Sequence, residues 1–242
     1  MNIKGWKFKA AVIIGGVALL LAIFLVSPFF HIDEIIIQGN SRISETEIRN
    51  RLDIGGNSNI LFIDTAAARK RIMGNLYIGD VTFRRELPDR LYVIVHERRP
   101  SAYVEHSPGS FLVLDDFGRV LEMRPQFREA LPLLEGLQFT RAQLGEILEV
   151  ENETDFASVV QYTQLLVAHN LIHRITHINV SDPANIRILI DYSEFHMGGV
   201  ADADAKVRTI VAVLEAMPDA NIRRGSMNLQ NNGKYFIFKL LQ

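Results

Sequence analysis

The chain has 242 residues, 48% of them hydrophobic and 22% charged, a composition that indicates neither disorder nor a fold with several membrane spans. Its formal net charge of −2 and the lack of a stripe of basic and aromatic residues argue against a nucleic-acid partner. Because it contains no cysteine, disulfides, thiolate nucleophiles and Cys-ligated metals are excluded.

An uncharged apolar run covers residues 10–30 and includes Ser27 as its markedly polar member. A helix needs about twenty apolar residues to cross the hydrocarbon core of a bilayer, so the run predicts a transmembrane helix. It is too long for the apolar region of a cleavable signal peptide, and no small-x-small cleavage site follows it. A buried helix of a water-soluble core is the less favoured interpretation.

The charges that flank this run predict its orientation. The three lysines before it are accompanied by no acidic residue, whereas Asp33 and Glu34 follow it. Under the positive-inside rule the N-terminus is then cytoplasmic. We therefore predict a cytoplasmic tail over residues 1–9, an anchor over residues 10–30 and an extracytoplasmic part from residue 31 onward.

The residues after the anchor predict elements in the order β-α-α-β-β. Ser44 and Glu47 have the spacing of a capping box, and Asp64 is a good N-cap residue for a second helix. Residues 86–89 contain a Pro-Asp pair that favours the turn of a hairpin. The predicted elements are a strand at residues 32–38, helices at residues 45–52 and 65–73, and strands at residues 78–85 and 91–97.

A change of pattern at Pro100 indicates a domain boundary, because proline ends the preceding strand. We predict a first domain over residues 31–98 and a β-rich second domain over residues 99–242. Its predicted strands are at residues 102–105, 111–114, 120–122, 175–180, 186–191, 226–229 and 234–241, and its helices at residues 155–169 and 201–217. The predicted fold class is α+β: one transmembrane helix, a β-α-α-β-β domain, and a mixed β-rich domain with two flanking helices.

Three histidines, His169, His173 and His177, are spaced by four residues and would share a face of one continuous helix, where they could bind zinc. Asn170 is a helix-stopping residue, and the segment from Ile175 onward predicts a strand. The third histidine would then lie on a different element, so we predict no metal site.

Paired acidic residues at 115–116 and 202–204 could in principle act in acid-base chemistry or hold a hard cation. Such pairs are far more often turn and helix-cap residues. The sequence has neither a Gly-x-Ser-x-Gly elbow nor a phosphate-binding loop. We therefore predict no catalytic residues, no cofactor and no small-molecule substrate.

The last predicted strand is the best candidate for a binding site. It has strong β propensity and lies near the end of the chain, where edge strands are common, and an edge strand can accept a strand from a partner. The predicted partner-binding residues are Lys234, Tyr235, Phe236, Ile237, Phe238, Lys239 and Leu240. That the strand is interior, or that its lysines merely protect it from aggregation, is an equally open interpretation.

Several short motifs, in order, resemble the FtsQ/DivIB family of bacterial cell-division proteins over essentially the whole chain. The motifs are residues 81–91, 95–103, 114–121 and 131–136, and Met197-Gly198-Gly199 before Lys206. The resemblance implies that the first domain is a polypeptide-transport-associated (POTRA) domain. It also implies a location in the inner membrane at the septum, with a periplasmic C-terminal domain.

The resemblance further implies a non-enzymatic, single-pass divisome scaffold that binds FtsB-like and FtsL-like proteins and helps to control septal peptidoglycan synthesis. In the family a strand of FtsB adds to the edge that corresponds to residues 234–241, with Tyr235, Phe236, Ile237 and Phe238 as the expected contacts. Residues 32–38 and the Arg84-Arg85 pair are implicated in recruitment and in contacts with other divisome components.

Three other classes of protein remain as alternatives. One is a membrane-anchored periplasmic hydrolase, for which the three histidines could supply a zinc site. Another is an anchored structural domain unrelated to division. The third is a transport component, since POTRA domains also occur in outer-membrane assembly proteins. The residues after Pro100 do not supply the many alternating segments that a β-barrel requires.

Overall fold

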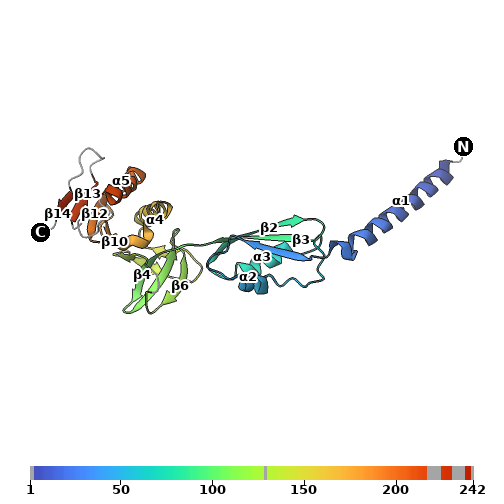
Figure 1. Cartoon of the computed structure of the whole chain (residues 1–242), viewed down its shortest axis with the longest axis horizontal. Helices are drawn as coiled ribbons and strands as arrows, with labels where there is room; N and C mark the ends of the chain where they lie inside the picture. The colour runs from blue at the N-terminus through green and yellow to red at the C-terminus, as the bar shows by residue number, and fades with distance from the viewer. Residues whose placement is uncertain (1–2, 128–129, 217–224, 231–237, 241–242) are drawn as a thin grey trace. The chain divides into compact units, whose positions relative to one another are not determined.

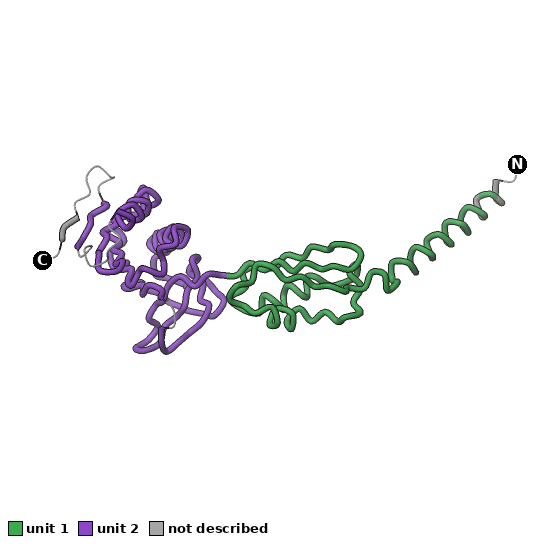
Figure 2. Tube along the Cα trace, viewed as in Figure 1, with its two compact units in different colours: residues 1–97 green, residues 98–242 purple. Residues whose placement is uncertain are grey.

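The computed structural model describes residues 3–127, 130–216, 225–230 and 238–240. The chain divides into two compact units, unit 1 at Met1–Glu97 and unit 2 at Arg98–Gln242 (Figure 2). Each unit has a hydrophobic core of its own.

Unit 1 begins with helix α1, Ile3–Leu25, which is followed by one 3₁₀ turn at Pro28–Phe30. Proline lacks an amide donor and disfavours the helical conformation of the residue before it, and Ser27 is accordingly extended, with φ −66° and ψ 156°. Phe30 is 7% exposed and belongs to the core of unit 1. The helix thus ends at Leu25, before residue 30, where we predicted the end of the anchor. No helix in the described part of the chain combines the length and hydrophobicity needed to cross a bilayer.

The rest of unit 1 is a three-stranded sheet with two helices (Figure 1). The elements are β1 (Glu34–Gln38), α2 (Glu45–Leu52), α3 (Thr65–Ile72), β2 (Ile78–Glu86) and β3 (Arg90–Glu97). The central strand β3 runs parallel to β1 and antiparallel to β2. Ser44 and Asp64 cap α2 and α3 by accepting the amides of Glu47 and Ala67. The predicted β-α-α-β-β order is confirmed.

The core of unit 1 forms between the inner faces of the two helices and the sheet. Ile48 and Leu52 of α2 and Ile72 of α3 are fully buried, as are Leu91 and Val93 of β3. Burial of each such side chain contributes about 1.5–3 kcal/mol of hydrophobic free energy, so the spacing of apolar residues along α2 explains why this short helix is stable.

The last residue of unit 1, Glu97, holds the loop between β1 and α2. Its carboxylate accepts the backbone N–H groups of Ser41, Arg42 and Ile43 at 2.8–3.0 Å, and the Ser41 hydroxyl at 2.9 Å. Burial raises the pKa of Glu97, but these hydrogen bonds lower it by more, so the net pKa lies below its ordinary value of 4.5. The carboxylate therefore stays ionised and keeps the loop on the end of β3.

Unit 2 is built on a nine-stranded sheet in the order β14-β13-β12-β11-β10-β7-β4-β5-β6. Its strands are β4 (Pro100–Ser107), β5 (Ser110–Asp115), β6 (Val120–Arg124), β7 (Leu133–Glu135), β10 (Ile175–Asn179), β11 (Ile186–Ile190), β12 (Ser193–Gly198), β13 (Gly225–Asn228) and β14 (Phe238–Leu240). A separate pair joins β8 (Phe139–Arg141) to β9 (Glu149–Val150). The helices are α4 (Glu153–Ala168) and α5 (Ala203–Ala216), with a 3₁₀ turn at Ile172–Arg174.

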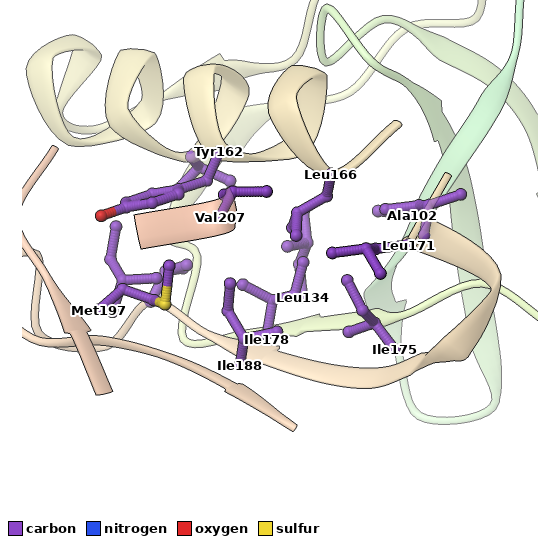
Figure 3. Packing of buried hydrophobic residues seen from close by; sticks show 14 of the residues in the cluster. Ala102, Leu134, Tyr162, Leu166, Leu171, Ile175, Ile178, Ile188, Met197 and Val207 are labelled. Atoms are coloured by element: carbon purple, nitrogen blue, oxygen red, sulfur yellow. The ribbon is translucent and has the colours of Figure 1, made fainter. Parts of the chain in front are cut away.

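The core of unit 2 lies between one face of this sheet and the two helices. Along β11, Ile186, Ile188 and Ile190 are buried while the residues between them are partly exposed, as expected for a sheet covered on one face. Figure 3 shows Tyr162 of α4 and Val207 of α5 packed over this face. The predicted α+β class is confirmed.

Unit 2 also contains strands that the sequence pattern did not predict, namely β7, β8, β9 and β12. β12 has the sequence Ser-Glu-Phe-His-Met-Gly, which lacks the β-branched residues on which strand prediction depends. It forms because Phe195 and Met197, both 0% exposed, pack into the core, so tertiary burial overrides weak local propensity.

Candidate functional site

The predicted binding strand falls partly outside the described residues. Lys234, Tyr235, Phe236 and Ile237 are not described, whereas Phe238, Lys239 and Leu240 form β14. Strand β14 pairs antiparallel with β13, with Phe238 opposite Met227, Lys239 opposite Ser226 and Leu240 opposite Gly225.

β14 stands at one end of the nine-stranded order. Within the described ranges its one hydrogen-bonded neighbour is β13, so the ladder does not continue on its other side. An edge of this kind presents a row of backbone N–H and C=O groups that another strand can pair with.

The strand next to this edge is fixed by the core. β13 runs parallel to β12, and α5 is the crossover helix that connects the two strands. Met227 is 4% exposed and Leu229 is 0% exposed, and the Leu229 amide donates to the carbonyl of His196 at 2.8 Å. The edge is therefore supported by a well-packed neighbour.

The sheet face opposite the helices carries a hollow of about 490 Å³ beside the same edge. It is lined by Glu135, His177, Asn179, Arg187, Leu189, Tyr192, Glu194 and Gly225. Its charges are paired: His177 Nδ1 lies 3.0 Å from Glu135 Oε1, and Arg187 Nη1 lies 3.4 Å from Glu194 Oε1. These side chains are about 40% exposed, so the pairs add little stability and make this face polar.

Two buried donors converge on the carbonyl oxygen of Gly199, in the loop that leads from β12 to α5. Tyr162 Oη and Lys206 Nζ both donate to it at 2.8 Å. Burial raises the pKa of Tyr162 to about 12. Burial lowers the pKa of Lys206, and the nearby carboxylate of Asp202 opposes that shift. The Tyr162 hydroxyl and the Lys206 ammonium therefore hold the loop at Gly199 against the core.

The three histidines of the predicted series lie on different elements. His169 is the C-cap residue of α4, His173 is in the 3₁₀ turn, and His177 is in β10. His169 Nε2 lies 3.5 Å from Asp204 Oδ1, and His173 Nδ1 lies 3.2 Å from the carbonyl oxygen of Ala130. No cluster of three potential metal ligands occurs in the described part of the chain.

The acidic pairs lie at the ends of elements, since Asp115 is the last residue of β5 and Asp204 is in the first turn of α5. Asp115 is 2% exposed, accepts the amides of Phe117 and Arg119 at 2.9 and 2.8 Å, and pairs with Arg98 Nη1 at 3.3 Å. Burial, followed by the charge of Asp115, raises the pKa of Asp116. Asp115 thus organises the β5–β6 turn, which accounts for its burial.

The arginine pair singled out in unit 1 lies in strand β2, close to the β2–β3 turn. The guanidinium of Arg84 stacks over the ring of Tyr92 at 4.1 Å, and Arg85 donates to the carbonyl of Ile63 at 3.2 Å. β1 and β2 are the two edges of the three-stranded sheet, so both segments that we predict to act in recruitment lie at edges.

Comparison with known proteins identifies the first domain. The sequence model of the family described as POTRA domain, FtsQ-type, matches residues 30–98. This range overlaps the sheet and both helices of unit 1 together with Phe30, whose side chain is part of their core.

Similarity to curated proteins extends over most of the chain. The cell division protein DivIB of Clostridium botulinum strain Hall is 23% identical over 218 residues, which cover 90% of this chain and 85% of the relative. The cell division protein FtsQ of Streptomyces bingchenggensis is 26% identical over 199 residues, covering 80% and 72%. The cell division protein FtsQ of Bradyrhizobium diazoefficiens is 32% identical over 111 residues, covering 46% and 32%.

These similarities confirm the resemblance found in the sequence and support a role in cell division. Residues 30–98 match the POTRA domain of the FtsQ type, and the chain is similar over most of its length to cell-division proteins named DivIB and FtsQ.

Proposed function

We propose that this protein is a non-enzymatic divisome scaffold that binds FtsB-like and FtsL-like division proteins through the β14 edge of unit 2. The single observation that carries the proposal is the position of β14 at the end of the nine-stranded sheet, with β13 as its neighbour among the described strands. The proposed contact residues remain Lys234, Tyr235, Phe236, Ile237, Phe238, Lys239 and Leu240.

The proposed topology is a single-pass inner-membrane protein with a cytoplasmic tail at residues 1–9 and an anchor within residues 10–30. Support for it comes from α1, whose large side chains from Val12 to Phe24 are 51–69% exposed although they are apolar. Such a surface is unfavourable in water and favourable in lipid. The POTRA domain at residues 31–98 and the β domain at residues 99–242 would then lie in the periplasm, at the septum.

Strand addition requires backbone groups that point away from β13. In an antiparallel ladder the N–H groups of adjacent residues point to opposite sides, so of Phe238 and Lys239 one directs its N–H outward and the other toward β13. Proline at the outward position removes a donor to the partner and leaves the β13 pairing intact.

The test is binding of the full-length chain, in nanodiscs, to the extracytoplasmic part of an FtsB-like partner. Variants Phe238→Pro and Lys239→Pro are compared with Met123→Pro in β6 at the opposite end of the sheet. We expect the outward-facing variant to weaken binding about tenfold or more while the circular dichroism spectrum is retained. The Met123→Pro variant should bind as the wild type does.

Unchanged binding by both edge variants would show that the partner does not use β14. Equal loss with all three variants would mean that any damage to the sheet abolishes binding, and strand addition at this edge would then be rejected.

A further inference from the structure

Four large apolar side chains of unit 1 are exposed although they lie outside α1. They are Val26 (63% exposed), Phe29 (59%), Phe62 (64%) and Leu87 (57%). In the described part of unit 1 that follows α1, these are the large hydrophobic residues that are exposed, and the others are partly or fully buried. Exposed phenylalanine and leucine that gather in one place mark an interaction surface.

Hydrogen bonds bring these four residues to the same end of the unit. The Asn59 side chain donates to the carbonyl of Leu25 at 2.7 Å, and the Ile60 amide donates to that of Phe30 at 2.8 Å. These contacts hold the segment that contains Phe62 beside the end of α1. On the other side, the Asp33 amide donates to the carbonyl of Asp89 at 2.9 Å, which fixes the β2–β3 turn and its Leu87.

Val26 and Phe29, which follow α1 directly, continue its exposed apolar surface. The rings of Phe24 and Phe29 stack at 5.9 Å, and Phe29 meets Phe30 edge-on at 5.1 Å. Phe30 and the partly buried Leu25 both pack in the core of the domain. The link from helix to domain is thus packed, and the exposed apolar surface passes from α1 onto the domain.

The length of α1 gives an independent reason for a lipid contact. Its uncharged part, residues 10–25, would span roughly 24 Å at about 1.5 Å per residue. The hydrocarbon core of a bilayer is about 30 Å thick, so this helix alone leaves several ångströms of apolar depth unmatched. The four exposed apolar side chains at the end of the domain next to α1 can occupy this remaining part of the hydrocarbon layer.

The charges near the turn do not create a strong attraction for anionic lipids. Arg84, Arg85 and Arg90 are matched in number by Glu34, Glu86 and Asp89, and Arg90 pairs with Glu34 at 3.2 Å and with Glu86 at 3.4 Å. Attachment therefore depends on apolar insertion and should occur on zwitterionic membranes as well.

We propose that Val26, Phe29, Phe62 and Leu87 form a lipid-docking surface by which the POTRA domain rests on the bilayer that holds α1. The proposal deepens the membrane anchoring proposed above and depends on it. The POTRA domain then contacts the bilayer directly, with the β2–β3 turn and the segment around Phe62 in the interfacial layer.

The test exploits the absence of cysteine, since each introduced cysteine carries the only label in the chain. Four full-length variants, Gly15→Cys, Thr46→Cys, Phe62→Cys and Leu87→Cys, receive an environment-sensitive fluorophore and are reconstituted in phosphatidylcholine vesicles. A side chain at residue 15 meets no atom within 4 Å. Thr46, exposed at the start of α2, is the control position on the same domain.

Lipids brominated near the top of the acyl chain should quench the labels at residues 62 and 87 and leave the label at residue 46 unquenched. Lipids brominated deeper should quench the label at residue 15. Quenching at residue 15 without quenching at residues 62 and 87 would overturn the lipid-docking surface but not the anchor. The exposed apolar side chains would then be expected to bind a protein partner instead. Absence of quenching at residue 15 would overturn the anchor and the docking surface together.

Discussion

The two edge strands of the nine-stranded sheet, β6 and β14, differ in whether another segment of the described chain covers them. At β6, the Val120 amide donates to the carbonyl of Glu146 at 2.9 Å, and the Val120 carbonyl accepts the Gly145 amide at 2.8 Å. The Leu148 amide also donates to the carbonyl of Gly118 at 3.0 Å. At β14, by contrast, the described residues provide pairing on the β13 side alone.

This difference indicates which end is available for a partner. The segment at residues 145–148 covers the start of β6 and is held there by Leu148, which is 2% exposed. A covering segment is a standard means of preventing strands from adding to an edge. A site for strand addition is therefore expected at β14 and not at β6.

The largest expected effect concerns the covered edge. Gly118 has φ +78°, and a Cβ atom there would lie 2.2 Å from the Phe156 ring. We expect Gly118→Ala to lower the free energy of unfolding by about 3 kcal/mol, from the left-handed backbone and the steric overlap together. Gly109 also has φ +78° but meets no atom within 4 Å, so Gly109→Ala should cost about 1–2 kcal/mol.

Urea unfolding of the full-length chain in detergent measures both variants. The folded fraction of Gly118→Ala should bind the FtsB-like partner as the wild type does, because the changed turn lies at the covered edge. Equal losses of stability in the two variants would show that contact with Phe156 does not hold this turn.

The second effect concerns a pair of methionines near opposite ends of the sheet. Met227 in β13 is 4% exposed, whereas Met123 in β6 is 48% exposed. Met227→Ala should lower the free energy of unfolding by about 2–3 kcal/mol and also weaken partner binding, because β13 supports the β14 edge. Met123→Ala should change stability by no more than about 0.5 kcal/mol and leave binding unchanged.

Thermal unfolding and partner titration are the two measurements for this pair. If Met227→Ala lost stability but bound the partner as tightly as the wild type, the packing of β13 would have no part in presenting the edge.

Local signals in the sequence predicted the elements of unit 1 well. The range 45–52 predicted for α2 matches Glu45–Leu52, because the capping pair Ser44 and Glu47 fixes where the helix begins. The predicted anchor extends past the end of α1 to Phe30, because hydropathy alone does not distinguish Phe30 in lipid from Phe30 in a protein core. Its burial follows from contacts with residues distant in the sequence.

The sheet order of unit 2 could not be predicted in the same way. Strand β12 was missed, and without it neither the parallel β12–β13 pair nor the crossover role of α5 can be inferred. The segment at residues 145–148 has no periodic pattern, since its role is to supply backbone hydrogen bonds to β6. The β propensity of the last strand was a correct guide for Phe238–Leu240, whereas its position in the order depends on non-local pairing.

The smallest expected effect concerns the loop between β12 and α5. Lys206 is 5% exposed and donates to the Gly199 carbonyl, which also accepts Tyr162 Oη. Lys206→Met keeps the volume of the side chain and removes one donor, so it should lower the free energy of unfolding by about 1 kcal/mol.

The dependence of stability on pH tests whether burial disfavours the charged form of Lys206. The folded pKa of Lys206 is lowered, so between that value and the ordinary 10.5 the unfolded chain binds more protons, and the contribution of Lys206 to stability rises with pH. Tyr162 acts in the opposite direction, but only above its ordinary pKa of 10.0, where the unfolded chain loses the phenolic proton first. Below pH 10 the difference in stability between wild type and Lys206→Met should therefore grow as the pH is raised. A constant difference would mean that the pKa of Lys206 is the same in the folded and the unfolded chain, so that burial in this loop does not disfavour the charged ammonium.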